Sequence, residues 1–157
     1  MNDSLQNNDL NIYINPSKTF ESLKKTDVFK EIISEVVRET EIDLNKTEIL
    51  EEIVKRESLS TTGFGDGFAI PHGKATGLDK PLIVLIRTDE KIDWESLDDQ
   101  PVSIIFLLIV PKENGETVHL KLLSKLAYHL MDKDIQKAFK DAETEKELKT
   151  VIGQIIK

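Results

Sequence analysis

The sequence contains no cysteine and no long hydrophobic run. The lack of cysteine excludes disulfides, thiol catalysis and thiolate metal sites within this chain, and it is compatible with a reducing cytosol. No apolar segment approaches the roughly 18 residues that a membrane-spanning helix needs. The first residues, Met1–Ser4, lack the basic and apolar regions of a signal peptide. We therefore expect a cytoplasmic protein.

Positive charge is also in short supply, because 21 Lys and Arg face 29 Asp and Glu, for a formal net charge of −8. A nucleic-acid-binding surface needs an excess of basic residues, so we expect no nucleic-acid partner. An acidic surface suits a basic protein partner, or it serves solubility alone. At 157 residues the chain is long enough for one domain with a full core.

Glycine is rare as well, yet four of the seven glycines fall within the fourteen residues Thr61–Lys74. Near the end of this glycine-rich stretch, His72 stands between Pro71 and Gly73. Glycine allows a partner to approach the main chain, and proline stiffens it. We therefore predict that His72 lies on a rigid, thinly covered turn and presents its imidazole to a partner outside the protein.

The N-terminal half predicts a strand followed by two helices. Residues 1–9 are polar, and we expect them to be flexible. Alternating residues predict a strand over Leu10–Ile14, and apolar residues at helical spacing predict a helix over Ser17–Glu39. Asn45 is a candidate N-cap with Glu48 three residues later, at the start of a helix over Thr47–Glu57.

Two apolar runs, Leu82–Ile86 and Val102–Val110, predict buried strands in the C-terminal half. Three helices should follow, over residues 117–131, 133–141 and 144–156. We expect the first of these to bury Leu120 and Leu126, with the other apolar residues Leu123, Ala127 and Leu130. Strands that alternate with helices predict an α/β sandwich, with both apolar runs inside one sheet and helices on both faces.

The three histidines each allow an ordinary structural role. His72 could be a loop residue that merely caps its surroundings. His119 opens a helix beside Leu123, so it could be half-buried and satisfied by a backbone carbonyl. His129 lies off the apolar stripe of that helix, and we expect it at the surface with no function.

Several chemistries can be set aside. Two histidines and a carboxylate could bind zinc, but no pair of ligands has helical metal spacing. The Gly-x-Ser-x-Gly pattern of serine hydrolases is absent, and the glycine-rich stretch is neither a Walker loop nor a dinucleotide fingerprint. What remains is a histidine nucleophile, since a neutral imidazole is nucleophilic near physiological pH. A second histidine and an arginine would stabilise the charge of the group that it carries.

An ordered set of segments resembles the enzyme IIA component of the bacterial phosphoenolpyruvate-dependent sugar phosphotransferase system, in the fructose/mannitol/nitrogen-regulatory class (type-2 EIIA). The resemblance covers about Glu48 to Ile152. Its segments are Arg56-Glu57, Thr62–Lys74, Asp99–Val102 before the second apolar run, Val110-Pro111 after it, His119-Leu120 and Leu123–Leu126. Phe64 and Phe68 depart from the family pattern, because smaller aliphatic residues are usual there.

The resemblance implies that His72 is the phosphorylated residue and that His119 and Arg56 border it. It implies a type-2 EIIA domain over residues 10–157, with a mixed, mostly parallel sheet flanked by helices on both faces. Family members accept a phosphoryl group from the carrier HPr and pass it to a cysteine of a IIB domain, which serves a IIC membrane component. No cofactor and no metal are implied.

The residues themselves fit this transfer. Phosphoryl transfer between nitrogens needs positioning and charge stabilisation more than acid–base chemistry. The glycines could expose Phe64 and Phe68 as a dry contact patch, and Asp66, Asp98 and Asp99 could meet a basic partner or could be ordinary solvated charges.

Three functions stay open. The first is a phosphocarrier for sugar uptake, with fructose as the expected sugar. The alternative is a nitrogen-regulatory protein that binds targets according to its phosphorylation state. A structural domain with an inactive site is the third, and the joint presence of His72, His119 and Arg56 argues against it.

Overall fold

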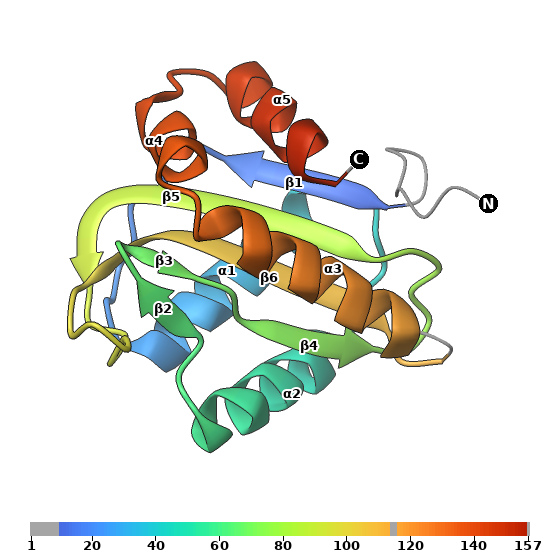
Figure 1. The fold of residues 1–157 in the computed structure, drawn as a ribbon. Helices are drawn as coiled ribbons and strands as arrows, with labels where there is room; N and C mark the ends of the chain where they lie inside the picture. The colour runs from blue at the N-terminus through green and yellow to red at the C-terminus, as the bar shows by residue number, and fades with distance from the viewer. Residues whose placement is uncertain (1–9, 114–115, 157) are drawn as a thin grey trace.

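The computed structural model describes residues 10–113 and 116–156, without the side chains of residues 116–119. These ranges form a six-stranded sheet with the order β1-β5-β6-β3-β2, and β4 continues the β3 edge by pairing with β6 (Figure 1). The strands are β1 (Asn11–Asn15), β2 (Gly63–Gly65), β3 (Phe68–Ala69), β4 (His72–Ala75), β5 (Leu82–Ile92) and β6 (Val102–Pro111). The helices are α1 (Lys25–Glu39), α2 (Lys46–Leu59), α3 (Glu116–Leu130), α4 (Lys133–Asp141) and α5 (Glu145–Ile155).

The predicted α/β fold class is confirmed. Pairs β1–β5, β3–β6 and β4–β6 are parallel, while β5–β6 and β2–β3 are antiparallel. The sheet is therefore mixed and mostly parallel. Helices α1 and α2 lie on one face, and α3, α4 and α5 lie on the other (Figure 1).

The two apolar runs supply the interior strands, as predicted. Side chains along a strand alternate between the two faces, so Val84 and Leu107 pack toward α1 and α2. Leu85 and Phe106 pack toward the other three helices. An uninterrupted apolar sequence is what a strand covered on both faces requires. Strand β5 also continues beyond the apolar run to Ile92, because its backbone still pairs with β6 there.

The predicted helix over Ser17–Glu39 begins too early. The observed helix starts at Lys25, and the preceding segment instead crosses the end of β5. The Lys18 N–H donates to the Arg87 carbonyl at 2.8 Å, and the Phe20 N–H donates to the Glu90 carboxylate at 2.7 Å. These bonds replace the ones a helix would have made, while Phe20 still reaches the core.

Helix α2 begins at the predicted cap, where the Asn45 side chain accepts a hydrogen bond from the Glu48 N–H at 3.0 Å. The Glu48 carboxylate does not complete a capping box. It accepts instead from the Thr76 N–H at 2.6 Å and the Thr76 hydroxyl at 2.9 Å. Helix α2 is thereby tied to the end of β4, the strand that carries His72.

The predicted apolar face of α3 is partly wrong. Leu120 is 59% exposed, whereas Leu122, Leu126 and Leu130 are fully buried. Leu123 and Ala127 are only partly buried. The helix contains so many leucines that its sequence fits more than one buried stripe, and packing on the sheet selects the stripe of Leu122.

Candidate functional site

His72 is the first residue of β4, where it pairs with Leu108 of the central strand β6. The Pro71 carbonyl extends this contact by accepting from the Leu108 N–H at 3.0 Å. His72 is only 7% exposed, so the prediction of a thinly covered turn is wrong. His72 borders a cavity of about 270 Å³, which is lined also by Glu52, Lys55, Arg56, Leu59, Gly73 and Lys74.

The glycine after His72 is favoured by close packing. A Cβ placed on Gly73 would lie 3.0 Å from Cγ1 of Ile53 in α2, which is tighter than ordinary contact. Glycine therefore lets β4 approach α2 closely. Because Ile53 is fully buried and Arg56 follows it by three residues, this approach also brings Arg56 next to His72.

Both ring nitrogens of His72 have a partner. Nε2 accepts a hydrogen bond from Arg56 Nε at 3.1 Å, and Nδ1 lies 3.1 Å from the Ile70 carbonyl. A guanidinium can only donate and a carbonyl can only accept, so Nδ1 carries the proton and Nε2 carries the lone pair. The structure thus defines a single tautomer.

The same surroundings keep the ring neutral. Burial lowers the pKa of the His72 imidazole below its ordinary value, and the Arg56 guanidinium acts in the same direction. The Ile70 carbonyl and the charge of Glu57 oppose them and raise the pKa. Because the net shift is downward, the imidazole is unprotonated at Nε2 at neutral pH.

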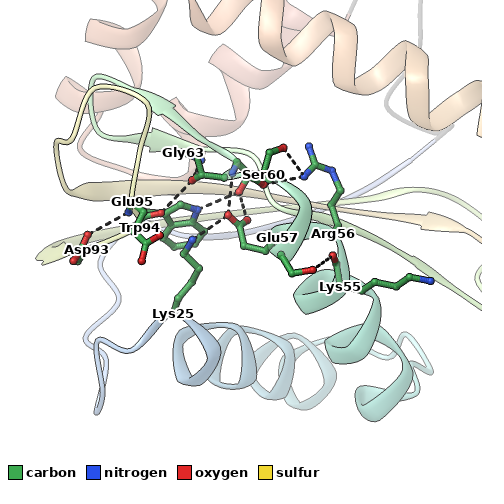
Figure 2. Close-up of polar contacts among 12 residues, drawn as sticks. Lys25, Lys55, Arg56, Glu57, Ser60, Gly63, Asp93, Trp94 and Glu95 are labelled. Carbon is green, nitrogen blue, oxygen red and sulfur yellow. Dashed lines mark hydrogen bonds and ion pairs between the residues drawn. The ribbon is translucent and has the colours of Figure 1, made fainter.

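Arg56 lies in the last turn of α2 and is held from a second side. Its Nη1 donates to the Ser60 carbonyl at 3.0 Å and lies 3.4 Å from the Ser60 hydroxyl (Figure 2). The guanidinium therefore bridges the loop after α2 and the ring of His72. A fixed cation beside a nucleophilic nitrogen is suited to an anionic group carried on that nitrogen.

Sequence reasoning missed the part played by Glu57, the neighbour of Arg56. Its side chain is 7% exposed and accepts hydrogen bonds from Lys25 Nζ at 3.0 Å, the Thr62 N–H at 2.9 Å and the Thr62 hydroxyl. Trp94 Nε1 in turn donates to that hydroxyl at 3.1 Å (Figure 2). Only its position next to Arg56 could have drawn attention to Glu57, because Lys25 and Trp94 are remote in the sequence.

The remaining histidines differ in what can be said of them. His119 falls within α3, but its side chain is outside the described side chains, so its predicted place beside His72 stays a prediction. His129 is half-buried, and its ring meets Tyr128 edge-on with a centroid distance of 5.1 Å.

The predicted contact patch of Phe64 and Phe68 is wrong. Phe68 is fully buried and stacks on Phe64 and Phe106, with centroid distances of 6.1 and 6.5 Å. A short strand, β3, turns the side chain of Phe68 into the core, and Phe64 is partly buried against it. Glycines around an aromatic residue therefore do not imply its exposure.

The acidic residues of the same region are engaged within the chain. The Asp66 carboxylate accepts from Lys133 Nζ at 2.7 Å and from Gln136 Nε2 at 3.1 Å, and Asp98 accepts from the Asp66 N–H at 2.9 Å. These contacts lower the pKa of the Asp66 carboxyl, through Lys133 first. Asp66 and Asp98 therefore fix the loop between β2 and β3.

Among the residues whose side chains are described, no group of three or more His, Asp or Glu is arranged to hold a metal ion. None of the helices in the described ranges combines the length and hydrophobicity needed to cross a membrane.

The site of His72 combines a neutral imidazole with a directed lone pair, a neighbouring guanidinium and a cavity open to a reactant.

Comparisons with known proteins give one family, whose members here carry two different names. Residues 13–155 match the family model described as phosphoenolpyruvate-dependent sugar phosphotransferase system, EIIA 2. A Haloferax volcanii protein named PTS system fructose-specific EIIA component is 31% identical over 139 residues, covering 86% of this chain and 90% of that protein. A Bradyrhizobium diazoefficiens protein named nitrogen regulatory protein is 44% identical over 102 residues, covering 63% of this chain and 66% of that protein.

Among solved structures, the nitrogen regulatory protein IIA-Ntr from Neisseria meningitidis is similar in fold and sequence. It superposes with a TM-score of 0.74 at 31% identity, covering 92% of each chain. The arrangement of one mixed sheet between two helical layers is thus shared with proteins of this kind.

Proposed function

Because this chain belongs to the EIIA 2 family of the phosphoenolpyruvate-dependent sugar phosphotransferase system, we propose that it is a phosphocarrier whose acceptor is Nε2 of His72. The family model supports our assignment of residues 10–157 to one EIIA domain. The observation that carries the proposal is the contact of 3.1 Å between Arg56 Nε and His72 Nε2. It leaves Nε2 as the nitrogen with a lone pair, beside a cation and a cavity.

In the first step, the Nε2 lone pair attacks the phosphorus of a phosphohistidine on HPr. The new Nε2–P bond forms as the P–N bond of the donor breaks, and the electron pair of that bond returns to the donor imidazole. As the phosphorus approaches, Arg56 shifts from the lone pair to the phosphoryl oxygens, which frees Nε2 for the attack and lets the guanidinium charge stabilise the transferred group. The Nδ1–H keeps its bond to the Ile70 carbonyl and so holds the ring in line.

In the second step, a cysteine thiolate of a IIB domain attacks the same phosphorus. An S–P bond forms, and the electron pair of the Nε2–P bond returns to the His72 imidazole. The IIB domain would then serve a IIC membrane component during sugar uptake. We expect fructose as the sugar, a preference supported by the similarity to the fructose-specific Haloferax component. No step needs a metal or a cofactor.

We include His119 in the proposed site as a second group that stabilises the phosphoryl charge. It stands in the first turn of α3, and helix N-termini favour anions. Replacement of His119 by alanine should slow labelling without abolishing it, since the loss of one donor costs only part of the stabilisation.

A second function is favoured by a separate observation. The chain is 44% identical to a nitrogen regulatory protein over 102 residues, and it superposes on IIA-Ntr with a TM-score of 0.74. A regulator of this kind would be phosphorylated on the same histidine but would act by binding a target protein in one phosphorylation state.

Transfer to a IIB domain separates the two functions. The protein is labelled with phosphoenolpyruvate, enzyme I and HPr, and then mixed with fructose-type and mannitol-type IIB domains. A carrier should lose its label to the IIB cysteine within seconds, because a carrier docks transiently and transfers reversibly. Stable retention of the label with every IIB domain would favour the regulatory function instead.

A further inference from the structure

Glu57 follows Arg56 and its side chain is only 7% exposed, but in the described contacts it touches neither nitrogen of His72. We propose that Glu57 is a positioning residue. It holds the loop after α2 so that Arg56 contacts Nε2 of His72 and the Ile70 carbonyl contacts Nδ1. This inference rests on the proposed function of His72, and its consequences for the ring can be measured without phosphorylation.

The carboxylate of Glu57 forms a clasp with Thr62, at the far end of the loop after α2. One oxygen accepts from the Thr62 N–H at 2.9 Å and from Lys25 Nζ at 3.0 Å, and the other accepts from the Thr62 hydroxyl. Since Trp94 Nε1 donates to that hydroxyl at 3.1 Å, the single hydroxyl proton must point to Glu57. Trp94 is fully buried, so the clasp is anchored in the core.

One route leads from the clasp to Arg56. Ser60 lies inside the loop that the Glu57–Thr62 bonds close, and its carbonyl accepts from Arg56 Nη1 at 3.0 Å (Figure 2). The Ser60 carbonyl therefore holds a second nitrogen of the guanidinium that contacts His72. An arginine side chain has many rotamers, and the second contact selects the one that places Nε on the ring.

A second route leads from the clasp to the other side of the ring. The Thr62 carbonyl accepts from the Ile70 N–H at 3.1 Å, and the Ile70 carbonyl accepts from His72 Nδ1 at 3.1 Å. A shift of Thr62 would thus move the peptide that holds the Nδ1 proton. Both nitrogens of His72 depend on one clasp, although Glu57 contacts neither.

Because hydrogen bonds connect the clasp to both nitrogens of His72, a positioning role of Glu57 can be distinguished from a role in fold stability alone. If Glu57 only stabilised the fold, its removal would lower the free energy of unfolding but leave the tautomer of His72 and the protection of the Arg56 Nε–H unchanged. If Glu57 positions the site, both readouts must change in protein that is still folded. A displacement on the order of 1 Å at a reacting group can slow a reaction about 100-fold.

The test compares three variants by 15N NMR of the histidine ring and of the arginine side chains. Glu57→Gln removes the charge and one acceptor, and Thr62→Val removes the bridging hydroxyl at nearly constant shape. Glu51→Gln is the control, because Glu51 is an exposed carboxylate on the same helix. We expect the first two variants to gain an Nε2-protonated form of His72 and to lose protection of the Arg56 Nε–H, while the control matches the wild type.

Kinetics with phospho-HPr give a second readout. Glu57→Gln should lower the rate at saturating phospho-HPr about 10- to 100-fold with KM unchanged. The substitution misaligns His72 and Arg56 but does not alter the binding of phospho-HPr. Folded Glu57→Gln and Thr62→Val proteins with the wild-type tautomer and the wild-type rate would overturn the inference. A wild-type protein that phospho-HPr does not label would instead refute the proposed function, and the NMR comparison would still decide the role of Glu57.

Discussion

Arg56 Nε lies 3.1 Å from His72 Nε2, although Arg56 stands near the end of α2 and His72 at the start of β4, after most of the glycine-rich stretch. The contact has two consequences. It assigns the proton of the neutral ring to Nδ1, and it puts a permanent cation where the charge of a phosphoryl group would develop.

Replacement of Arg56 should impair transfer without unfolding the protein. We expect Arg56→Gln to lower the rate of phosphoryl uptake from phospho-HPr about 100- to 1,000-fold, the cost of removing a preorganised donor at a developing charge. The matched control is Arg38→Gln, because Arg38 is exposed at the end of α1, where its Nε pairs with the carboxylate of the neighbouring Glu39 at 3.1 Å. Equal rates for the two variants would show that Arg56 takes no part.

The titration of His72 should be displaced to low pH. Burial, aided by Arg56, places the pKa of the imidazole below its usual value of about 6.5. A 1H–15N NMR titration should therefore give a midpoint below that value for His72, while exposed histidine in a denatured control titrates near it. A midpoint at or above about 6.5 would mean that the ring is charged more readily than the structure implies.

The same shift makes stability depend on pH in a defined direction. Below about 6.5 the unfolded chain takes up a proton on His72 before the folded protein does, so the free energy of unfolding falls as the pH decreases. Above that pH both states are neutral at His72, and this residue adds no pH dependence. Urea unfolding at several pH values should show this component in the wild type and not in His72→Gln.

Two glycines should respond to alanine with opposite signs. Gly73→Ala places a Cβ 3.0 Å from the buried Ile53 side chain, so we expect a loss of about 1 to 3 kcal/mol in the free energy of unfolding. Gly153 lies within α5 with nothing within 4 Å of such a Cβ, so Gly153→Ala should add about 0.5 to 1 kcal/mol. Similar unfolding free energies for both variants would contradict the close approach of β4 to α2.

The sequence predicted the central strands well because their physical cause is local. A strand covered on both faces needs apolar residues at every position, and both apolar runs have them. The start of α1 was predicted poorly because Lys18 and Phe20 form hydrogen bonds with β5, about seventy residues away in the sequence. The local spacing of apolar residues does not reveal such distant contacts.

The site could be predicted in part for the same reason. His72 is marked by its flanking Pro71 and Gly73, and Arg56 by its place in the resemblance. The burial of His72 and the clasp of Glu57 could not be read from the sequence. The first arises where β4 packs against β6 and α2, and the second where α1, α2 and the loop before β6 meet. Trp94 and Thr62 are 32 residues apart in the sequence, so no local pattern links them.

The most direct test of the central claim identifies the atom that carries the phosphoryl group. The protein is labelled with phosphoenolpyruvate, enzyme I and HPr, and the product is examined by 31P and 15N NMR beside His72→Ala. We predict one acid-labile, base-stable phosphoryl group on Nε2 of His72, and no label on the variant. Full labelling of His72→Ala, or a phosphoryl group on Nδ1, would contradict the account.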